Sequence, residues 1–526
     1  MKRRFNTAGP CIEWLHYMIP ALRRLPEAPG LVEQLGYFVV HAPRQTGKTT
    51  AVRALAKELT ASGRYAALYF SCEGGQAAGE DFDTAERIVL SRIRDEAASA
   101  LPPELVPPPF PEVTAGDRLV VGLSAWARAC PRPLVLFFDE IDALHGASLI
   151  AVLRQLRAGF PRRPDEFPAS VILCGLRDVR DYKTASGGDA TRLGTASPFN
   201  IKLESLRLGD FTPEEVRELY AQHTADTGQV FTEEALVRAF EVTCGQPWLV
   251  NALAREIVEK MAVPPEQPIT RAHVEQAKER LILARATHLD SLAAKLHEPR
   301  VKRFIEPILA GTLDRADASY DDDVLYCRDL GLLARNKPLR IANPIYHEVL
   351  ARLLAGSVEE QVLAEPRSFV LPDGRLAFRR LLREFAAFWR EHGDVLATGM
   401  PYHEVAPQLV LMAYLQRVVN GGGVIDREYG IGRGRIDLLV RWPYRKPDGT
   451  KAVQRRALEM KVWRPGKVDP KKEGLKQLDA YLERLGLSRG VLVIFDRRRE
   501  AEGIMKTARF EETVSPAGRK VMLLRA

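Results

Sequence analysis

Ala42-Pro43-Arg44-Gln45-Thr46-Gly47-Lys48-Thr49 follows an apolar run, Tyr37 to Val40, and precedes a run that favours a helix, Thr50 to Leu55. A strand, a loop and a helix in this order bring backbone N–H groups and a helix N-terminus together, as binding of nucleotide phosphates requires. In such a loop Lys48 reaches the β and γ oxygens, and the Thr49 hydroxyl binds Mg²⁺. Ala42 replaces the first glycine of the usual pattern. The predicted nucleotide-binding residues of the loop are Arg44, Gln45, Thr46, Gly47, Lys48, Thr49 and Thr50.

A second motif, Leu134 to Glu140, is an apolar strand that ends in two carboxylates. Asp139 is placed to hold the Mg²⁺ shell, and Glu140 is the natural base to polarise the attacking water. Taken alone, the run also fits a buried strand with solvated acids, and Gly-Lys-Thr also fits an ordinary loop. Because the two motifs occur together, the sequence predicts an ATP-hydrolysing site.

Short apolar runs alternate with helical stretches between Gly36 and Leu208, which is typical of an α/β fold with a parallel sheet. A proline-rich run from Pro102 to Pro111 predicts a surface loop within this domain. From Thr212 to Leu283 the pattern turns helical, with Thr212 as an N-cap before a proline and two acids. The expected strands are Tyr37–His41, Ala66–Ser71, Leu134–Phe138, Val171–Cys174 and Asn200–Leu203.

Two further positions are candidates for nucleotide contacts. Arg177 follows the run Val171 to Cys174, where phosphate-contacting side chains often lie, although a surface ion pair explains it equally well. Gly245-Gln246-Pro247-Trp248 lies in the helical region, where it also fits a simple break between helices. The residues alone leave both alternatives open.

Residues 42–49, Phe137 to Asp142, Gly245 to Pro247 and Asn343 to Tyr346 together resemble bacterial AAA-like ATPases, relatives of the archaeal ATPases and the signalling (STAND) NTPases. The resemblance spans about residues 5–354. It implies a helical lid that brings Pro247 near the nucleotide, and a winged helix after the lid. It also implies that residues 5–10 and His16-Tyr17 flank the adenine.

The expected recognition helix of that winged helix begins with Tyr320-Asp321-Asp322-Asp323. Three consecutive carboxylates suit a helix N-terminus but repel the phosphates of DNA. We therefore expect a packing or switch role for this segment rather than groove reading.

A third motif joins Gly434-Arg435-Ile436-Asp437 to Ala457-Leu458-Glu459-Met460-Lys461. Both runs are predicted strands, and the two-residue period places Glu459 and Lys461 on the same face. Burying such charges in an apolar sheet is costly unless they bind a metal or form a network. Asp437 and Glu459 are thus the predicted ligands of a second divalent ion, with Lys461 positioning the nucleophile or the charge.

This arrangement resembles the PD-(D/E)XK nuclease superfamily over about residues 400–496, with Asp437 as the first acid and Glu459-x-Lys461 as the second element. The resemblance implies a restriction-endonuclease-like α/β domain with Mg²⁺, or alternatively Mn²⁺, at its site. It also implies catalytic roles for Glu404, beside the helix Val405 to Val419, and for Gln477, on the helix Leu475 to Leu485. The element order expected is helix, three strands, helix and a last strand, Val491 to Phe495. An ion-paired edge of an inactivated nuclease fold is the alternative.

Net charge is +8, but residues 431–526 alone carry 24 Lys+Arg against 12 Asp+Glu, or +12. A local positive field favours a polyanion, so we expect nucleic acid, DNA rather than RNA, at this domain; a basic surface without a partner is equally compatible with charge alone. Six scattered cysteines fit reduced thiols in a cytoplasmic protein. Neither a secretory signal nor a membrane span is expected.

The sequence therefore predicts an α/β multidomain protein in which ATP regulates or powers a Mg²⁺-dependent nuclease. The rival is a STAND-like nucleotide switch or scaffold whose C-terminal domain binds DNA or a partner without cleavage. Homo-oligomerisation is left open. The predicted domains are a P-loop core (1–208), a helical lid (209–285), a winged-helix-like domain (286–356), a helical connector (357–394) and a nuclease-like domain (395–526).

Overall fold

The computed structural model describes residues 3–176, 199–284, 295–296, 298–309, 321–336, 338–350, 369–399, 406–419, 423–431, 434–463, 466–496 and 509–526. By internal packing the chain forms two compact units: Met1–Ala286 with Asp317–Lys337, and Thr287–Ala316 with Pro338–Ala526. This division runs through the predicted winged-helix segment, and the predicted domain boundaries stay predictions.

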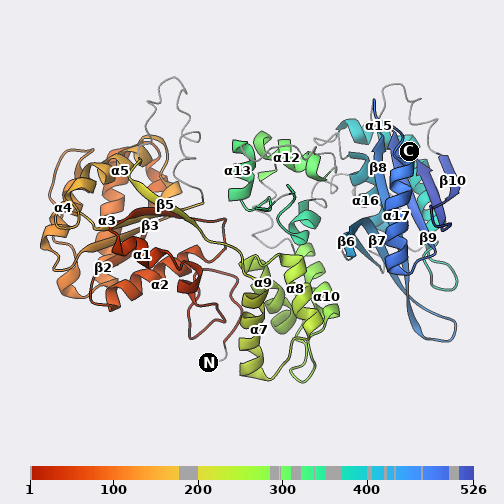
Figure 1. The fold of residues 1–526 in the computed structure, drawn as a ribbon, viewed down its shortest axis with the longest axis horizontal. Coiled ribbons are helices and arrows are strands. Elements are labelled where there is room, and N and C mark those ends of the chain that lie inside the picture. The colour runs from red at the N-terminus through yellow and green to blue at the C-terminus, as the bar shows by residue number, and fades with distance from the viewer. Residues whose placement is uncertain are drawn as a thin grey trace. The chain divides into compact units, whose positions relative to one another are not determined.

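The first unit is built on a parallel sheet (Figure 1). Its strand order is β2-β3-β4-β1-β5. Four strands lie within one residue of their predicted bounds because they are continuous buried runs. The fifth prediction, Asn200–Leu203, was wrong in its bounds: only Leu206 of this strand is buried, so the strand lacks a continuous apolar run. The strands are β1 (Tyr37–His41), β2 (Ala66–Ser71), β3 (Leu134–Asp139), β4 (Ser170–Gly175) and β5 (Lys202–Arg207).

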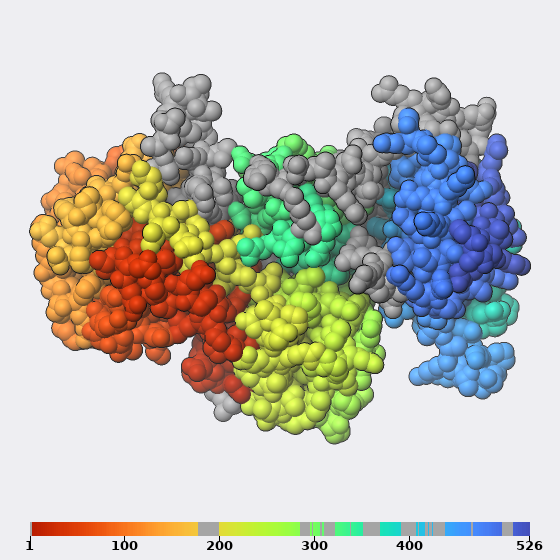
Figure 2. Space-filling model, viewed as in Figure 1, coloured from red at the N-terminus to blue at the C-terminus, as the bar shows by residue number. Residues whose placement is uncertain are grey.

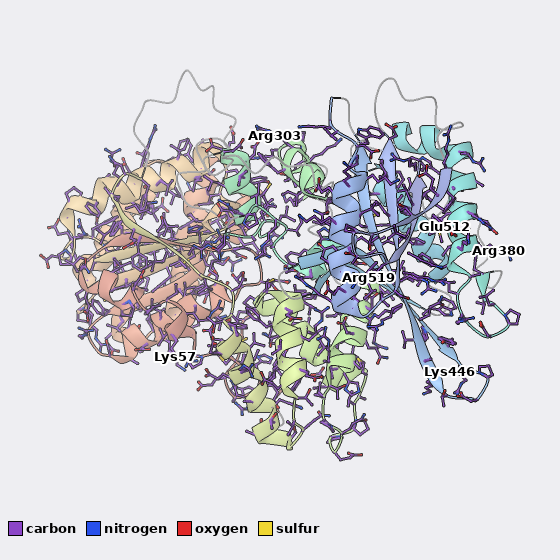
Figure 3. All side chains as sticks on the ribbon, turned by 45° about the vertical axis from the view of Figure 1, so that its right-hand side comes forward. Lys57, Arg303, Arg380, Lys446, Glu512 and Arg519 are labelled. Atoms are coloured by element: carbon purple, nitrogen blue, oxygen red, sulfur yellow. The ribbon has the colours of Figure 1, made fainter. Side chains whose placement is uncertain are left out.

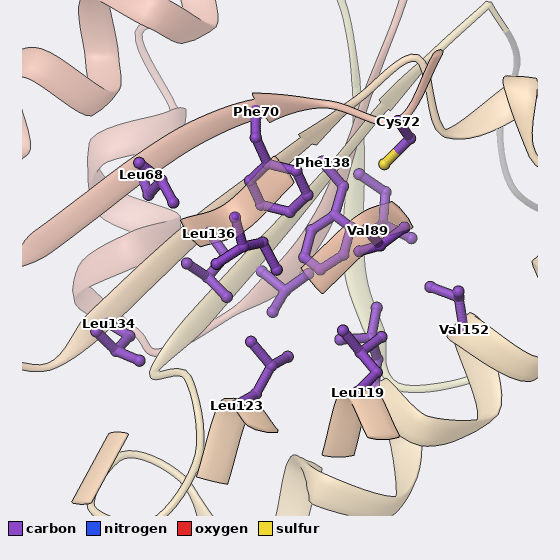
Figure 4. Packing of buried hydrophobic residues seen from close by; sticks show 14 of the residues in the cluster. Leu68, Phe70, Cys72, Val89, Leu119, Leu123, Leu134, Leu136, Phe138 and Val152 are labelled. Carbon is purple, nitrogen blue, oxygen red and sulfur yellow. The ribbon is translucent and has the colours of Figure 1, made fainter. Parts of the chain in front are cut away.

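Two apolar layers cover this sheet because successive side chains of a strand point to opposite faces. Phe138 packs with Phe70, Leu119, Leu123 and Val152 in the layer of α3, α4 and α5 (Figure 4). The neighbouring Phe137 faces the other layer, with α1 and α2. The helices are α1 (Ala28–Glu33), α2 (Lys48–Ala61), α3 (Phe82–Ala100), α4 (Arg118–Ala129) and α5 (Gly146–Gly159), and the 3₁₀ turns are η1 (Ala21–Arg24), η2 (Glu73–Ala78), η3 (Pro103–Leu105), η4 (Ile141–Ala143) and η5 (Phe160–Arg162).

A helical region follows β5, as predicted. Thr212 accepts a hydrogen bond from the backbone N–H of Glu215, and the Glu215 side chain accepts one from Thr212, which confirms the predicted N-cap. The elements are α7 (Pro213–Thr227), α8 (Glu233–Thr243), α9 (Pro247–Arg255), the π-helical turn η7 (Glu256–Lys260) and α10 (Arg271–Leu283).

Helix α13 (Asp322–Asp329) belongs to the first unit, whereas α12 (Pro299–Leu309) belongs to the second. Asp321 caps α13 by accepting a hydrogen bond from the Asp323 N–H. At the other end of the helix, the Asp329 carboxylate lies 3.6 Å from the guanidinium of Arg207 at the end of β5. The packing or switch role expected of the segment stays a prediction, as does the winged helix itself.

The second unit contains a six-stranded mixed sheet in the order β10-β11-β9-β8-β7-β6. Helices α15 and α16 share a core with one face, where Trp389 contacts Phe495, and α17 packs on the other. Helix α15 runs across the predicted boundary at residue 394. The elements are α15 (Phe378–Gly399), α16 (Ala406–Val419), β6 (Val424–Ile431), β7 (Gly434–Arg445), β8 (Lys451–Trp463), α17 (Lys471–Leu485), β9 (Arg489–Asp496), β10 (Arg509–Val514) and β11 (Lys520–Arg525).

The prediction that Val491 to Phe495 forms the last strand was wrong, since β10 and β11 follow it. β11 pairs parallel to β9, and β10 pairs antiparallel to β11 at the sheet edge. Most side chains of β10 are exposed, so it lacks the apolar run used to find strands. Among the helices that the structure describes, none is long and apolar enough to cross a bilayer.

Candidate functional sites in the two sheet units

The loop after β1 adopts a conformation that exposes backbone N–H groups. Gln45 and Gly47 both have positive φ, 60° and 87°, and Gly47 is the N-cap of α2. Lys48 donates a hydrogen bond to the Gly175 carbonyl at the end of β4, 2.7 Å away. Its ammonium group is therefore held at the carboxyl edge of the sheet, beside the start of the helix.

Thr49 and Asp139 form one contact at that edge. The Thr49 hydroxyl donates to the Asp139 carboxylate at 2.7 Å, and the Tyr69 hydroxyl donates to the same oxygen at 3.0 Å. Asp139 is fully buried. The pKa of Tyr69 is raised mainly by the burial of Tyr69 itself and secondly by the negative charge of Asp139. The two predicted Mg²⁺ ligands are thus adjacent, and Tyr69 orients the acid.

Glu140 has a left-handed backbone, φ 55°, which turns it out of the strand after Asp139. Its carboxylate accepts a hydrogen bond from Ser71 at the end of β2. Burial raises the pKa of Glu140, the Ser71 bond opposes that rise, and the Asp139 charge adds to it. The predicted base is therefore held by a hydroxyl on the neighbouring strand.

A cleft of about 600 Å³ opens over these residues. Arg44, Gln45, Gly47, Lys48, Thr49, Thr50 and Glu140 of the predicted set line it. Thr46 instead is buried, and its hydroxyl donates to the Pro43 carbonyl, so it shapes the loop.

A smaller hollow, about 120 Å³, adjoins the cleft and shares Gly9, Gln45, Gly47 and Thr50 with it. The helical region contributes Pro247 and Trp248, and the N-terminal segment contributes residues from Asn6 to Ala21. Trp248 donates to the Thr7 carbonyl at 2.9 Å, which ties the two walls together. Tyr17 lines the hollow, but Phe5 and His16 are not among its lining residues.

Gly245 has a structural reason to be glycine. Its φ is 77°, and a Cβ there would lie 1.9 Å from the Phe211 carbonyl oxygen. Phe211, which also lines the hollow, donates its N–H to the Gly245 carbonyl. The Gly-Gln-Pro run therefore fixes the link from the sheet to the helices as well as breaking a helix.

Sequence reasoning missed Ser71, Tyr69, Phe211 and Arg24. Arg24 donates to the Thr46 carbonyl at 2.7 Å and to the Gly209 carbonyl, and its guanidinium lies 4.7 Å from the Phe211 ring centroid. It thus braces the loop against the start of the helical region. No motif marked Arg24, because its two partners lie about 20 and about 185 residues away in the sequence.

Residues 38–166 match the family described as "ATPase family associated with various cellular activities (AAA)". The first unit therefore contains an AAA-type P-loop ATPase domain. No curated protein matches the chain.

Several solved structures match parts of this chain at low identity and at TM-scores below 0.5. The Walker-type ATPase of Pyrococcus abyssi shares 12% identity at a TM-score of 0.46, over 66% of this chain and 99% of that one. The RuvB Holliday-junction branch migration motor of Thermotoga maritima shares 15% at 0.34, over 62% and 92%. The Orc1 protein of Aeropyrum pernix, in complex with DNA, shares 13% at 0.31, over 64% and 93%.

The second unit brings Asp437, Glu459 and Lys461 together on β7 and β8. The Lys461 ammonium lies 2.9 Å from one Glu459 carboxylate oxygen, and Asp437 accepts the Met460 backbone N–H at 2.7 Å. Glu459 is only 3% exposed, and its other oxygen, Oε2, has no hydrogen-bond partner among the described residues.

The pKa values of Glu459 and Lys461 in this cluster are both shifted. Burial, then the Asp437 charge, raises the pKa of Glu459 to about 8, despite the opposing effect of Lys461. Burial works against the charge of Lys461, yet the neighbouring carboxylates, Glu459 first, raise its pKa. At Glu459 the rise in pKa caused by burial is thus larger than the fall caused by Lys461. A positive charge at Oε2 would lower the pKa of Glu459 again.

Helix α17 completes the cluster. Gln477 lies there with its Oε1 buried and without a partner in the described part of the chain, while its amide donates to Glu473 at 3.2 Å. Gly474 lets the helix approach, because a Cβ there would lie 2.7 Å from Leu492 and 3.4 Å from Lys461. Within the described residues no three His, Cys, Asp or Glu side chains form a metal cluster. Arg177 and Glu404 lie outside the described residues.

Proposed function

We propose that this chain hydrolyses ATP in its AAA-type domain to regulate or power a metal-dependent nuclease in its second sheet unit, acting on nucleic acid, DNA rather than RNA. One observation carries the nuclease proposal. On adjacent strands, Asp437, Glu459 and Lys461 converge in a buried setting that leaves one Glu459 oxygen unpaired. An unpartnered buried carboxylate oxygen is costly, and a divalent ion would remove that cost.

In the ATPase half, the loop N–H groups and Lys48 bind the β and γ phosphates of ATP. Thr49 and Asp139 are adjacent and fit a Mg²⁺ ion, Thr49 directly and Asp139 in its shell. Glu140 polarises the attacking water, and Ser71 orients its carboxylate. Pro247 and Trp248 close the adjoining hollow over the base. Arg177 remains a proposed phosphate contact.

In the nuclease half, Asp437 and Glu459 would hold the ion, and the buried Gln477 Oε1 lies on the helix that faces them. Mg²⁺ commonly keeps several waters and takes only one or two carboxylates, which suits this donor set; Mn²⁺ is an alternative. The bound ion supplies an activated water and charge stabilisation at the phosphate. Lys461 positions the nucleophile beside Glu459, and Glu404 is the further proposed acid.

The proposal is tested by two activities of the full chain. Phosphate release from ATP is expected in wild type and lost in Lys48→Ala, with stimulation by nucleic acid if the two halves are linked. Nicking of supercoiled plasmid is expected with Mg²⁺, lost with EDTA, and lost in Glu459→Gln. Nicking that persists in Glu459→Gln would remove the nuclease claim, and ATP hydrolysis by Lys48→Ala would remove the ATPase assignment of this loop.

The rival function is a nucleotide switch without cleavage. Asp329 on α13 contacts Arg207 at the sheet edge that also carries the phosphate-binding loop. This contact favours a switch in which α13 responds to the nucleotide bound by the AAA-type domain. A crystal soaked in Mn²⁺ separates the two functions: density between Asp437 and Glu459 supports the nuclease, and its absence supports the switch.

A further inference from the structure

Strands β7 and β8 extend beyond the six-stranded sheet as a two-stranded ribbon. Among the described residues, β6 pairs with β7 only as far as Arg441, and β9 pairs with β8 only from Leu458. Beyond these points β7 and β8 pair with each other alone, up to Arg445 opposite Lys451. This two-stranded extension projects from its unit in Figures 1 and 2, and Lys446 is labelled on it in Figure 3.

We name residues 441–455 the basic ribbon, because they contain five basic residues and one acidic residue, a net charge of +4 (5 − 1). The acid, Asp448, lies in the turn, where it accepts hydrogen bonds from the Thr450 N–H and hydroxyl. The basic residues of the ribbon are Arg441, Arg445, Lys446, Lys451 and Arg455. Four of them, Arg445, Lys446, Lys451 and Arg455, take part in no ion pair between described residues.

One face of the basic ribbon is covered. Trp442 donates to the Gly374 carbonyl at 2.9 Å, and Tyr444 packs against the core of α15 and α16. Gln454 exchanges two hydrogen bonds with the backbone of Leu376, at 2.8 and 3.1 Å. The segment before α15 therefore holds this face in place.

The opposite face is open and positive. The register places Arg441 opposite Arg455, Pro443 opposite Val453 and Arg445 opposite Lys451 on it. Val453 is 56% exposed, and Arg445, Lys451 and Arg455 are exposed. Like charges directly opposite each other in an antiparallel pair destabilise it. Charged side chains of either sign protect an exposed strand edge from aggregation. Such protection therefore does not explain why the charges on this face are all positive.

This open face is also the face of the nuclease cluster. Arg455, Ala457, Glu459 and Lys461 alternate along β8, and Ala457 packs under α17, the helix that approaches Lys461 at Gly474. At about 3.3 Å per residue, Arg455 lies about 13 Å and Lys451 about 26 Å along the strand from Glu459. Phosphates recur every ~3.4 Å along one DNA strand, so these distances correspond to about four and about eight nucleotides.

We propose that the basic ribbon is a docking surface for the phosphate backbone of duplex DNA. The ribbon holds the duplex about four to eight nucleotides from the phosphate at Glu459 and Lys461. The position of that phosphate rests on the proposed nuclease function, but the docking itself does not.

The test is binding of the full chain to a fluorescein-labelled duplex by anisotropy, in EDTA and over a series of salt concentrations. The ribbon variant is Lys451→Gln with Arg455→Gln. The matched control is Arg509→Gln with Lys520→Gln, an equal charge loss at exposed positions of β10 and β11 across the same sheet. Circular dichroism verifies that both variants fold.

The ribbon variant is expected to bind about tenfold more weakly at low salt, with a log–log salt slope shallower by about two. The control is expected to bind within about twofold of wild type. Equal binding by both variants would overturn the proposal. So would ribbon-dependent binding to phosphatidylserine vesicles combined with ribbon-independent binding to the duplex, which would indicate a membrane surface instead.

Plasmid nicking measured in parallel separates the two proposals. If wild type fails to nick DNA but binding depends on the ribbon, the nuclease proposal fails and the docking surface stands. If wild type nicks DNA and the ribbon variant binds as tightly as the control, the docking surface fails and the nuclease proposal stands.

Discussion

Ser71 at the end of β2 donates a hydrogen bond to the carboxylate of Glu140, the residue that follows β3. The parallel register of the two strands pairs Ser71 with Asp139, so the hydroxyl reaches the next residue along. The carboxylate of Glu140, the residue proposed to polarise water, is therefore held by Ser71 at the end of the neighbouring strand β2.

Replacing Ser71 with Ala removes a bond that lowers the pKa of Glu140, while the burial that raises this pKa remains. The carboxylate then stays protonated to a higher pH. We expect the acid limb of the kcat–pH profile for ATP hydrolysis to move to higher pH, and Ser71→Thr, which keeps the hydroxyl, to restore it. An acid limb that does not move in Ser71→Ala would show that the bond has no influence on the base.

Replacing Glu140 with Gln keeps the size of the side chain but removes its proton acceptor. A general base contributes typically 10²–10⁴-fold, so kcat is expected to fall by about 10²-fold or more. Nucleotide affinity, measured with a fluorescent ATP analogue, is expected to stay within a few-fold of wild type because Lys48 and the loop are intact. An undiminished kcat would assign the base elsewhere.

Replacing Gly245 with Ala places a methyl group 1.9 Å from the Phe211 carbonyl oxygen, at φ 77°. A strained backbone costs about 1–3 kcal/mol, and the clash adds to it. We expect a lower thermal unfolding midpoint and weaker nucleotide binding, since Phe211 lines the hollow beside the loop. Gly228→Ala is the control: φ is 76° there, but a Cβ meets nothing within 4 Å. Equal effects of the two variants would contradict a steric role for Gly245.

The sequence predicted those parts of the fold that a single stretch of the chain specifies. Examples are the apolar run of β3, the loop before α2, and the alternation that places Glu459 and Lys461 on one face of their strand. Ser71 and Tyr69 could not be predicted, because their roles depend on which strands lie side by side. β10 was missed because an edge strand can expose most of its side chains, as at Glu511 and Glu512, and then contains no apolar run. The Asp437 bond to the Met460 N–H likewise depends on strand pairing.

Metal binding at Glu459 is expected to depend on pH. Because burial and Asp437 raise the pKa of Glu459 to about 8, this carboxyl holds a proton at lower pH, which the ion must displace. Affinity for Mn²⁺, followed by electron paramagnetic resonance, should therefore rise about tenfold per pH unit below 8 and level off above it. Glu459→Gln should bind Mn²⁺ weakly without this dependence. Wild-type affinity that is flat from pH 6 to 8 would contradict a site at Glu459.

The measurement that bears most directly on the whole proposal is the initial rate of plasmid cleavage with Mg²⁺, with and without ATP, for wild type, Lys461→Ala and Lys48→Ala. We predict that wild type cleaves at a rate that changes with ATP, that Lys48→Ala loses the response to ATP, and that Lys461→Ala does not cleave. Equal cleavage by wild type and Lys461→Ala would contradict the nuclease site, and a wild-type rate indifferent to ATP would contradict the link between the two halves.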